Sequence, residues 1–176
     1  MKENLSIKEA GLRSIDIVRV MLVKDSNSSY RIKAIRNSES VVSVVKKFLA
    51  NEDREVFIAI NLDRSSKINS INVVAIGSAS EASIHPREIF KAAILSNATH
   101  IVLAHNHPSG NPEPSEEDRQ ITYRLLQCGD LLGIRVEDHI IIGDDEYSHC
   151  MTYTEKNGKK EIMWLRDKIK SDQEAS

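Results

Sequence analysis

The pattern of apolar positions along the chain changes period several times, and each change marks a predicted element. Residues 15–23 and 30–36 are rich in apolar and β-branched residues and flank a polar turn, a pattern typical of a strand pair. After Ser38 and Ser40, which are suitable N-caps, apolar residues recur at helical spacing up to Leu49. Two further strands are predicted after this helix, at residues 55–63 and 68–76.

The second half of the chain continues the alternation of helices and strands. Pro86 fits the first position of a helix, and residues 100–105 form a short apolar run typical of a strand buried on both faces. Ser115 opens another helix, which we expect to end near Gly129, and residues 134–142 form a last strand. Three helices between strands indicate an α/β (α+β) fold in which helices sandwich a mixed β-sheet.

These elements divide the chain into three parts. Residues 1–37 hold the strand pair, which we expect to belong to the same domain as the main body at residues 38–153. Residues 154–176 are predicted to form a charged C-terminal helix or tail. The helical interpretation depends on one thin apolar stripe that docks the segment: Ile162, Leu165 and Ile169. A partner-binding tail is the alternative.

Composition narrows the class of protein without naming its chemistry. A length of 176 residues with 40% hydrophobic and 28% charged residues fits one globular domain. Lys plus Arg (24) nearly balances Asp plus Glu (26), so the net charge of −2 argues against a polybasic surface for nucleic acid or anionic lipid. No apolar run has the length of a membrane span or signal peptide, and Cys128 and Cys150 form no zinc-ribbon or disulfide pattern. We therefore expect a cytoplasmic enzyme or binding domain without a membrane partner.

The candidate chemistry lies in the segment HNHPSGNPEPSEED, residues 105–118. His105 and His107 leave a strand two residues apart, so their side chains face the same side. Neutral imidazoles at this spacing are natural zinc ligands. Asp118 lies in the first turn of the next helix, and the loop with its prolines and glycine can return it to the histidines. Three protein ligands and one open position are typical of a catalytic zinc site.

Each of these features has a simpler structural explanation when it is taken alone. A His-x-His pair is weak support for a metal site, and Ser115 with Asp118 forms a pattern related to the capping box. Their joint occurrence at one strand end and one helix start favours the metal site. Four other histidines are predicted to pack or hydrogen bond: His85, His100, His139 and His149. Asp138 and His139 are also candidates to support a metal ligand from outside.

The same segment resembles the JAMM (JAB/MPN-plus) metalloprotease motif, in which His-x-His is followed after seven residues by Ser-x-x-Asp. Residues 83–110, SIHPREIFKAAILSNATHIVLAHNHPSG, and residues 131–143, LLGIRVEDHIIIG, are similar to the RadC branch of that superfamily. The resemblance covers roughly residues 40–153. It implies a JAB/MPN-like metalloprotease fold and one Zn²⁺ per chain, with water as the fourth ligand and three protein ligands: His105, His107 and Asp118.

The resemblance also implies the roles of two further residues. The family uses an upstream glutamate as general acid/base, in a pattern like Arg-Glu-x-Phe that matches residues 54–57 and indicates Glu55; Glu81 and Glu88 are its rivals by position. The family serine maps to Ser115, whose hydroxyl can face a developing oxyanion while it caps the helix. The implied activity is hydrolysis of peptide or isopeptide bonds in a protein or peptide substrate that the sequence does not identify.

A DNA-repair-associated factor with a non-catalytic metal site is the alternative that the family resemblance brings. Many RadC proteins carry an N-terminal helix-hairpin-helix region that binds DNA. Residues 1–50 predict instead a strand pair and a helix, with Gly11 as the single glycine available for such a hairpin. The net charge gives DNA association no support. A zinc deaminase is excluded because the sequence has no Pro-Cys-x-x-Cys element.

Overall fold

The computed structural model describes six stretches of the chain: residues 21–23, 38–49, 52–77, 84–144, 146–156 and 159–164. The strand pair predicted at residues 15–23 and 30–36 falls outside these stretches, except for residues 21–23, which belong to no helix or strand. The expected division at residue 37 is therefore not tested by the structure.

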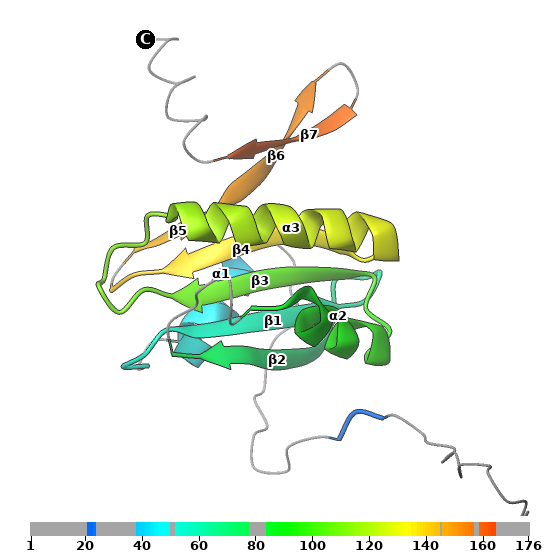
Figure 1. The fold of residues 1–176 in the computed structure, drawn as a ribbon, viewed down its shortest axis with the longest axis horizontal. Helices are drawn as coiled ribbons and strands as arrows, with labels where there is room; N and C mark the ends of the chain where they lie inside the picture. The colour runs from blue at the N-terminus through cyan, green and yellow to red at the C-terminus, as the bar shows by residue number, and fades with distance from the viewer. Residues whose placement is uncertain are drawn as a thin grey trace, which may run out of the picture.

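A five-stranded mixed sheet forms the centre of the molecule, with strand order β2-β1-β3-β4-β5 (Figure 1). Its strands are β1 (Val56–Leu62), β2 (Ile68–Ile76), β3 (His100–Asn106), β4 (Arg135–Ile142) and β5 (Tyr147–His149). β3 and β4 are parallel, whereas the other neighbours are antiparallel. The first residues of β1 therefore lie beside the last residues of β3, and Phe57 pairs with His105.

Helices cover both faces of this sheet, which explains why β1 is buried along its whole length. α1 (Ser38–Leu49) packs on one face, where its valines meet the even-numbered residues of β1 and β3. α2 (Pro86–Leu95) and α3 (Glu116–Leu132) pack on the other face against the odd-numbered residues (Figure 1). The predicted mixed sheet sandwiched by helices is confirmed.

The end of α3 corrects one prediction. The helix does not end near Gly129 but continues to Leu132 and is capped by Gly133 in the left-handed region, with φ of 68°. Gly129 serves a different purpose, because a Cβ there would lie 2.5 Å from the carbonyl oxygen of Ile134. Gly129 allows the helix to approach the chain leading into β4 closely, while Gly133 provides the turn.

The C-terminal segment corrects a second prediction. β6 (Met151–Lys156) and β7 (Lys159–Trp164) form an antiparallel hairpin beyond α3, separate from the main sheet (Figure 1). The helix expected there is thus wrong for residues 159–164, and residues 165–176 lie outside the described stretches. In the hairpin, residues pair across the two strands, as Tyr153 does with Ile162. These pairs stabilise the segment more than a thin apolar stripe would stabilise a helix.

Candidate metal centre

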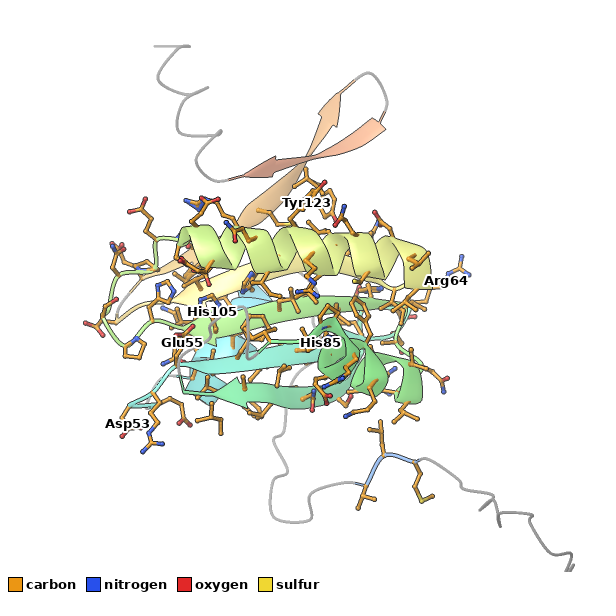
Figure 2. All side chains as sticks on the ribbon, in the orientation of Figure 1. Asp53, Glu55, Arg64, His85, His105 and Tyr123 are labelled. Carbon is orange, nitrogen blue, oxygen red and sulfur yellow. The ribbon has the colours of Figure 1, made fainter. Side chains whose placement is uncertain are left out.

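Four side chains with metal-binding atoms meet at the end of the sheet where β3 finishes. Glu55 immediately precedes β1, His105 and His107 come from the end of β3 and the loop after it, and Asp118 lies in the first turn of α3. One ligand atom from each lies within 4.8 Å of the others. Figure 2 shows Glu55 and His105 close together at this end, whereas His85 lies away from them beside α2. The antiparallel pairing of β1 with β3 brings residues fifty positions apart to the same point.

The spacing of three of these groups matches the requirements of a tetrahedral metal site. Nε2 of His105 lies 3.0 Å from Nε2 of His107 and 3.1 Å from Oδ1 of Asp118. Nε2 of His107 lies 3.4 Å from Oδ2 of Asp118. Two ligand atoms about 2.0–2.1 Å from a tetrahedral zinc are separated by about 3.3–3.4 Å. The two histidines and Asp118 therefore fit a single small cation.

The two histidine rings are held from behind by hydrogen bonds to their other nitrogens. Nδ1 of His107 lies 2.8 Å from the carbonyl oxygen of Asn111, to which it can only donate, so its Nε2 keeps a free lone pair. Nδ1 of His105 lies 2.9 Å from Nε2 of His139. The His105 ring also stacks on Phe57, with a centroid distance of 5.6 Å. Outer contacts of this kind fix the orientation of metal-binding histidines.

Asp118 combines its place in the metal group with a structural task at the start of α3. The Ser115 hydroxyl donates to Oδ2 of Asp118 at 2.6 Å and accepts the backbone N–H of Asp118 at 3.1 Å. The backbone N–H of Ser115 also donates to Oδ2, which completes a capping box. Oδ1 of Asp118 faces His105. The capping and metal-binding interpretations of these residues are therefore compatible.

The electrostatics of the group keep Asp118 ionised. Burial alone would raise the pKa of Asp118, but its interactions with the rings of His105 and His107 and the hydrogen bond from Ser115 outweigh burial and lower that pKa far below its ordinary value. The hydrogen bond with Asp118 raises the pKa of His107. Burial lowers the pKa of His139 well below its ordinary value, so that ring is neutral at pH 7. The site thus offers an anion flanked by imidazoles.

The loop between His107 and α3 is braced by the turn that follows β4. The backbone N–H of His107 donates to the carbonyl of Ile142 at 2.8 Å, and that of Asp144 donates to Gly110 at 3.2 Å. Gly110 has φ of 79°, a conformation that favours glycine. A Cβ on Gly143 would lie 2.1 Å from the carbonyl oxygen of Gly110. The loop and the turn therefore touch backbone to backbone, which fixes His107 in place.

Asn106 connects the metal-binding strand to the segment that carries Glu55. Its side chain lies on the face opposite to His105 and His107, and it is 5% exposed. Its amide oxygen accepts the backbone N–H of Val56 at 2.8 Å, and its amide nitrogen donates to the carbonyl of Arg54 at 2.9 Å. The backbone on both sides of Glu55 is thereby fastened to β3.

The structure distinguishes two of the three glutamates that compete for the role of base, Glu55 and Glu88. Oε1 of Glu55 lies 4.0 Å from Nε2 of His105, and Glu55 offers a ligand atom within 4.8 Å of those of the other three groups. Glu88 is paired with Lys91 and Arg87 on the exposed side of α2, and these hydrogen bonds lower its pKa. A general base at neutral pH needs the opposite shift. Glu81 lies outside the described residues.

The remaining histidines have structural partners, as the sequence predicts. His85 caps α2 by accepting the backbone N–H of Arg87, and Nδ1 of His149 lies 2.7 Å from Asp138. His139 is the exception, because it contacts His105 directly and thus takes the supporting position that the sequence analysis allowed it. His100 lies near the turn before β2, with its Nε2 3.5 Å from the hydroxyl of Ser66.

Asn106 and Thr122 belong to no motif, and the sequence alone did not predict a role for either. The hydroxyl of Thr122 lies 2.6 Å from Nδ1 of His139, which is seventeen residues further along the chain. A polar residue at an inward position of a buried strand or helix is the one signal that could have indicated them. Asn106 at the end of an apolar run meets that criterion.

A cleft opens beside the metal group, between α1 and the ends of β3 and β4. Its volume is about 280 Å³, and its lining includes His107, Asn106, Lys46 and Asp144. Of the four residues of the metal group, His107 alone lines this cleft. Within the stretches that the structure covers, no helix is long and apolar enough to cross a membrane.

Fold and site together define the class of a JAB-type domain with a candidate His/Asp/Glu metal centre. Residues 35–157 match the family described as the RadC-like JAB domain, and the chain belongs to that family. The matched residues include all four members of the metal group. The resemblance drawn from the sequence is therefore confirmed.

Relatives in several bacteria carry the name UPF0758 protein. The one from Caldanaerobacter subterraneus subsp. tengcongensis is 37% identical over 131 residues, which cover 74% of this chain and 55% of the relative. That of Desulforamulus reducens is 43% identical over 114 residues, covering 65% and 50%. That of Clostridioides difficile is 51% identical over 94 residues, covering 53% and 40%. The chain thus spans about half the length of the curated relatives it matches.

Proposed function

We propose that this protein is a zinc-dependent hydrolase of the JAMM type, which cleaves peptide or isopeptide bonds with an activated water. One observation carries the proposal. Nε2 of His105 lies 3.0 Å from Nε2 of His107 and 3.1 Å from Oδ1 of Asp118, and Nε2 of His107 lies 3.4 Å from Oδ2 of Asp118. Oε1 of Glu55 lies 4.0 Å from Nε2 of His105. Three ligands with a separate carboxylate nearby is the arrangement of zinc sites that perform hydrolysis.

His105, His107 and Asp118 would hold the ion, since two imidazoles and one carboxylate form a common catalytic zinc set. When bound, zinc acts as a Lewis acid and lowers the pKa of a bound water to about 7. The ionised state of Asp118 supports this assignment, because a carboxylate binds a cation only when it is deprotonated.

Glu55 would act as the general acid/base. Its distance from His105 leaves room for a water between the carboxylate and the metal group. It would accept the proton of that water and then donate it to the leaving amine. Asn106 would keep Glu55 at this distance by holding the backbone of Arg54 and Val56.

Ser115 would stabilise the oxyanion that forms when the carbonyl is attacked. Its hydroxyl donates to Oδ2 of Asp118, so this second role requires the hydroxyl to turn toward the substrate. The Ser115 oxygen can continue to accept the backbone N–H of Asp118 while it does so. Removing an oxyanion donor typically lowers kcat by about 10²–10³.

The experiment that tests this proposal uses Glu55→Gln with Glu88→Gln as its matched control. Zinc-loaded proteins are offered a library of fluorogenic peptides and lysine-linked isopeptides, and Glu55→Gln is also used to trap a substrate from cell extract. We expect Glu55→Gln to keep the zinc content of the unmodified protein and to hydrolyse about 10²–10⁴ more slowly, because glutamine cannot accept the proton. Glu88→Gln should remain close to the unmodified protein, since Glu88 is paired on the surface of α2.

Two outcomes would contradict the proposal at different points. If Glu88→Gln lost hydrolysis while Glu55→Gln kept it, the assignment of Glu55 as the base would be wrong, but the assignment of the metal ligands would be unaffected. A zinc-loaded protein that hydrolyses no member of the library, together with a Glu55→Gln protein that traps no substrate, would reject the hydrolase.

A further inference from the structure

A buried chain of hydrogen bonds runs behind the metal group and joins two of its members. Nδ1 of His105 lies 2.9 Å from Nε2 of His139, and Nδ1 of His139 lies 2.6 Å from the hydroxyl of Thr122. The Thr122 hydroxyl in turn lies 2.5 Å from the backbone carbonyl of Asp118. His105, His139 and Thr122 are each 0% exposed. Water therefore does not compete for any of these bonds.

The direction of every bond in this chain follows from its last member. The Asp118 carbonyl can only accept, so the single hydroxyl proton of Thr122 lies on that bond. The Thr122 oxygen then accepts from His139, which places a proton on Nδ1 of that ring. In a neutral imidazole the other nitrogen is an acceptor. Nε2 of His139 therefore accepts, and Nδ1 of His105 donates.

The reverse direction leaves an uncompensated contact. If the Thr122 hydroxyl donated to His139, no proton would lie between the Thr122 oxygen and the Asp118 carbonyl, which are 2.5 Å apart. Two buried oxygens at that distance without a hydrogen between them repel each other. His105 would then carry its proton on Nε2 and could donate it to Oδ1 of Asp118 at 3.1 Å, but that nitrogen would have no lone pair for a cation.

We propose that Thr122 and His139 are positioning residues that fix His105 in the tautomer whose Nε2 lone pair faces the metal group. The inference rests on the proposed metal site and goes beyond it, because it assigns a task to two residues outside that group. The chain begins at one proposed ligand, His105, and ends on the backbone of another, Asp118. One threonine hydroxyl thus sets the proton position on a ring two bonds away.

Thr122→Val and Thr122→Ser form a matched pair for the test, since valine keeps the shape of threonine without its hydroxyl and serine keeps the hydroxyl. The first readout is ¹⁵N NMR of the histidine rings in the metal-free protein. We expect His105 to be protonated on Nδ1 in the unmodified protein and in Thr122→Ser, and to become a mixture of tautomers in Thr122→Val. The second readout is Zn²⁺ affinity by competition with a chromophoric chelator. Thr122→Val should bind Zn²⁺ about 10–100-fold more weakly, the usual effect of losing an outer partner of a metal-binding histidine.

Two further variants keep the test decisive. Cys150→Ala alters packing at the sulfur that Thr122 also contacts, at 3.6 Å, and it should leave both readouts unchanged because the chain does not pass through Cys150. If Thr122→Val does not fold, His139→Gln and His139→Leu replace it. Glutamine has one acceptor and one donor group and should preserve most Zn²⁺ affinity, whereas leucine has neither and should lose it.

The results that overturn the inference are distinct from those that overturn the hydrolase. His105 protonated on Nε2 in the unmodified metal-free protein would overturn it, and so would unchanged Zn²⁺ affinity in both Thr122→Val and His139→Leu. If the protein has no hydrolytic activity, both measurements still test the positioning role of Thr122 and His139. The ring proton and the Zn²⁺ affinity are measured without any substrate.

Discussion

At the scale of single residues, the alternation of side chains along β3 places the proposed metal ligands and the residue that supports Glu55 on opposite faces of the strand. His105 and His107 lie on one face of the strand, and Asn106 between them reaches the opposite face. On that face its side-chain amide donates to the backbone carbonyl of Glu52 and accepts the backbone N–H of Val56. The end of β3 therefore provides two proposed metal ligands and also Asn106, which binds the backbone on both sides of the proposed base, Glu55.

Replacing Asn106 by alanine tests that fastening. The Val56 N–H and the Arg54 carbonyl would lose their partner in a buried setting, so we expect the free energy of unfolding to fall by about 1–3 kcal/mol. Urea denaturation measures this change. Asn69→Ala is the control, because the Asn69 side chain donates to Ser96 at an exposed position and should cost less than about 0.5 kcal/mol. Equal effects of the two changes would refute the assigned role of Asn106.

The sequence predicts the residues whose chemistry is written in a local motif. His105, His107 and Asp118 could be proposed as one group because their spacing lies within fourteen residues. Asn106 and Thr122 could not be assigned in this way, since each acts through partners that only the sheet and the α3 packing bring near. Glu55 could be chosen over Glu88 only by family resemblance, and its distance from His105 is a property of strand pairing.

At the scale of elements, the metal group depends on the contact between two short connections. The loop after β3 and the turn after β4 meet at Gly110 and Gly143, where the carbonyl of Gly110 accepts the backbone N–H of Asp144. The parallel pairing of β3 with β4 places both connections at the same edge of the sheet. Glycine is needed at position 143 because a Cβ there would lie 2.1 Å from the backbone carbonyl of Gly110, and at position 110 because a Cβ would lie 2.4 Å from the side chain of Asp144.

Gly143→Ala should therefore disturb the site from a position outside it. Its Cβ would lie 2.1 Å from the Gly110 carbonyl, so the loop carrying His107 must shift. We expect a loss of about 1–3 kcal/mol in unfolding free energy, as for other overpacked sites, together with weaker Zn²⁺ binding in chelator competition. Gly133→Ala is the control, since no atom lies within 4 Å of its Cβ and it caps the far end of α3. It should cost stability through its positive φ but leave Zn²⁺ affinity unchanged. Unchanged affinity in Gly143→Ala would show that the loop is not braced by this contact.

Hydrophobic period predicts the elements of the main sheet well and the hairpin beyond it poorly. Strands β1 to β4 and the three helices coincide with the expected segments to within a few residues, because each has a strong apolar face. The charged segment from residue 155 offered a stripe of only three apolar residues, and pairing with β6 decided its conformation. The end of α3 was predicted wrongly at Gly129 because glycine is favoured both where a helix ends and where two segments pack closely, and Gly129 serves the second purpose.

At the scale of the whole molecule, the fold supports the site without needing a metal. Two hydrophobic cores lie on the two faces of the sheet, one under α1 and one under α2 and α3. The metal group lies at the end of β3 and borders the core under α2 and α3, where His105 stacks on Phe57. A core of this size is sufficient for folding, unlike that of a zinc finger. Variants that lose the metal should therefore stay folded, and their metal content can be compared directly with that of the unmodified protein.

The metal content of the purified protein tests the central claim most directly. Elemental analysis, after purification without chelators and dialysis against trace zinc, should give about one zinc per chain. His105→Ala should give none, because a site with three protein ligands that loses one imidazole retains too little coordination. Circular dichroism verifies that both proteins are folded. A folded, unmodified protein that holds no zinc, or a His105→Ala protein that holds as much zinc as the unmodified one, would contradict the account.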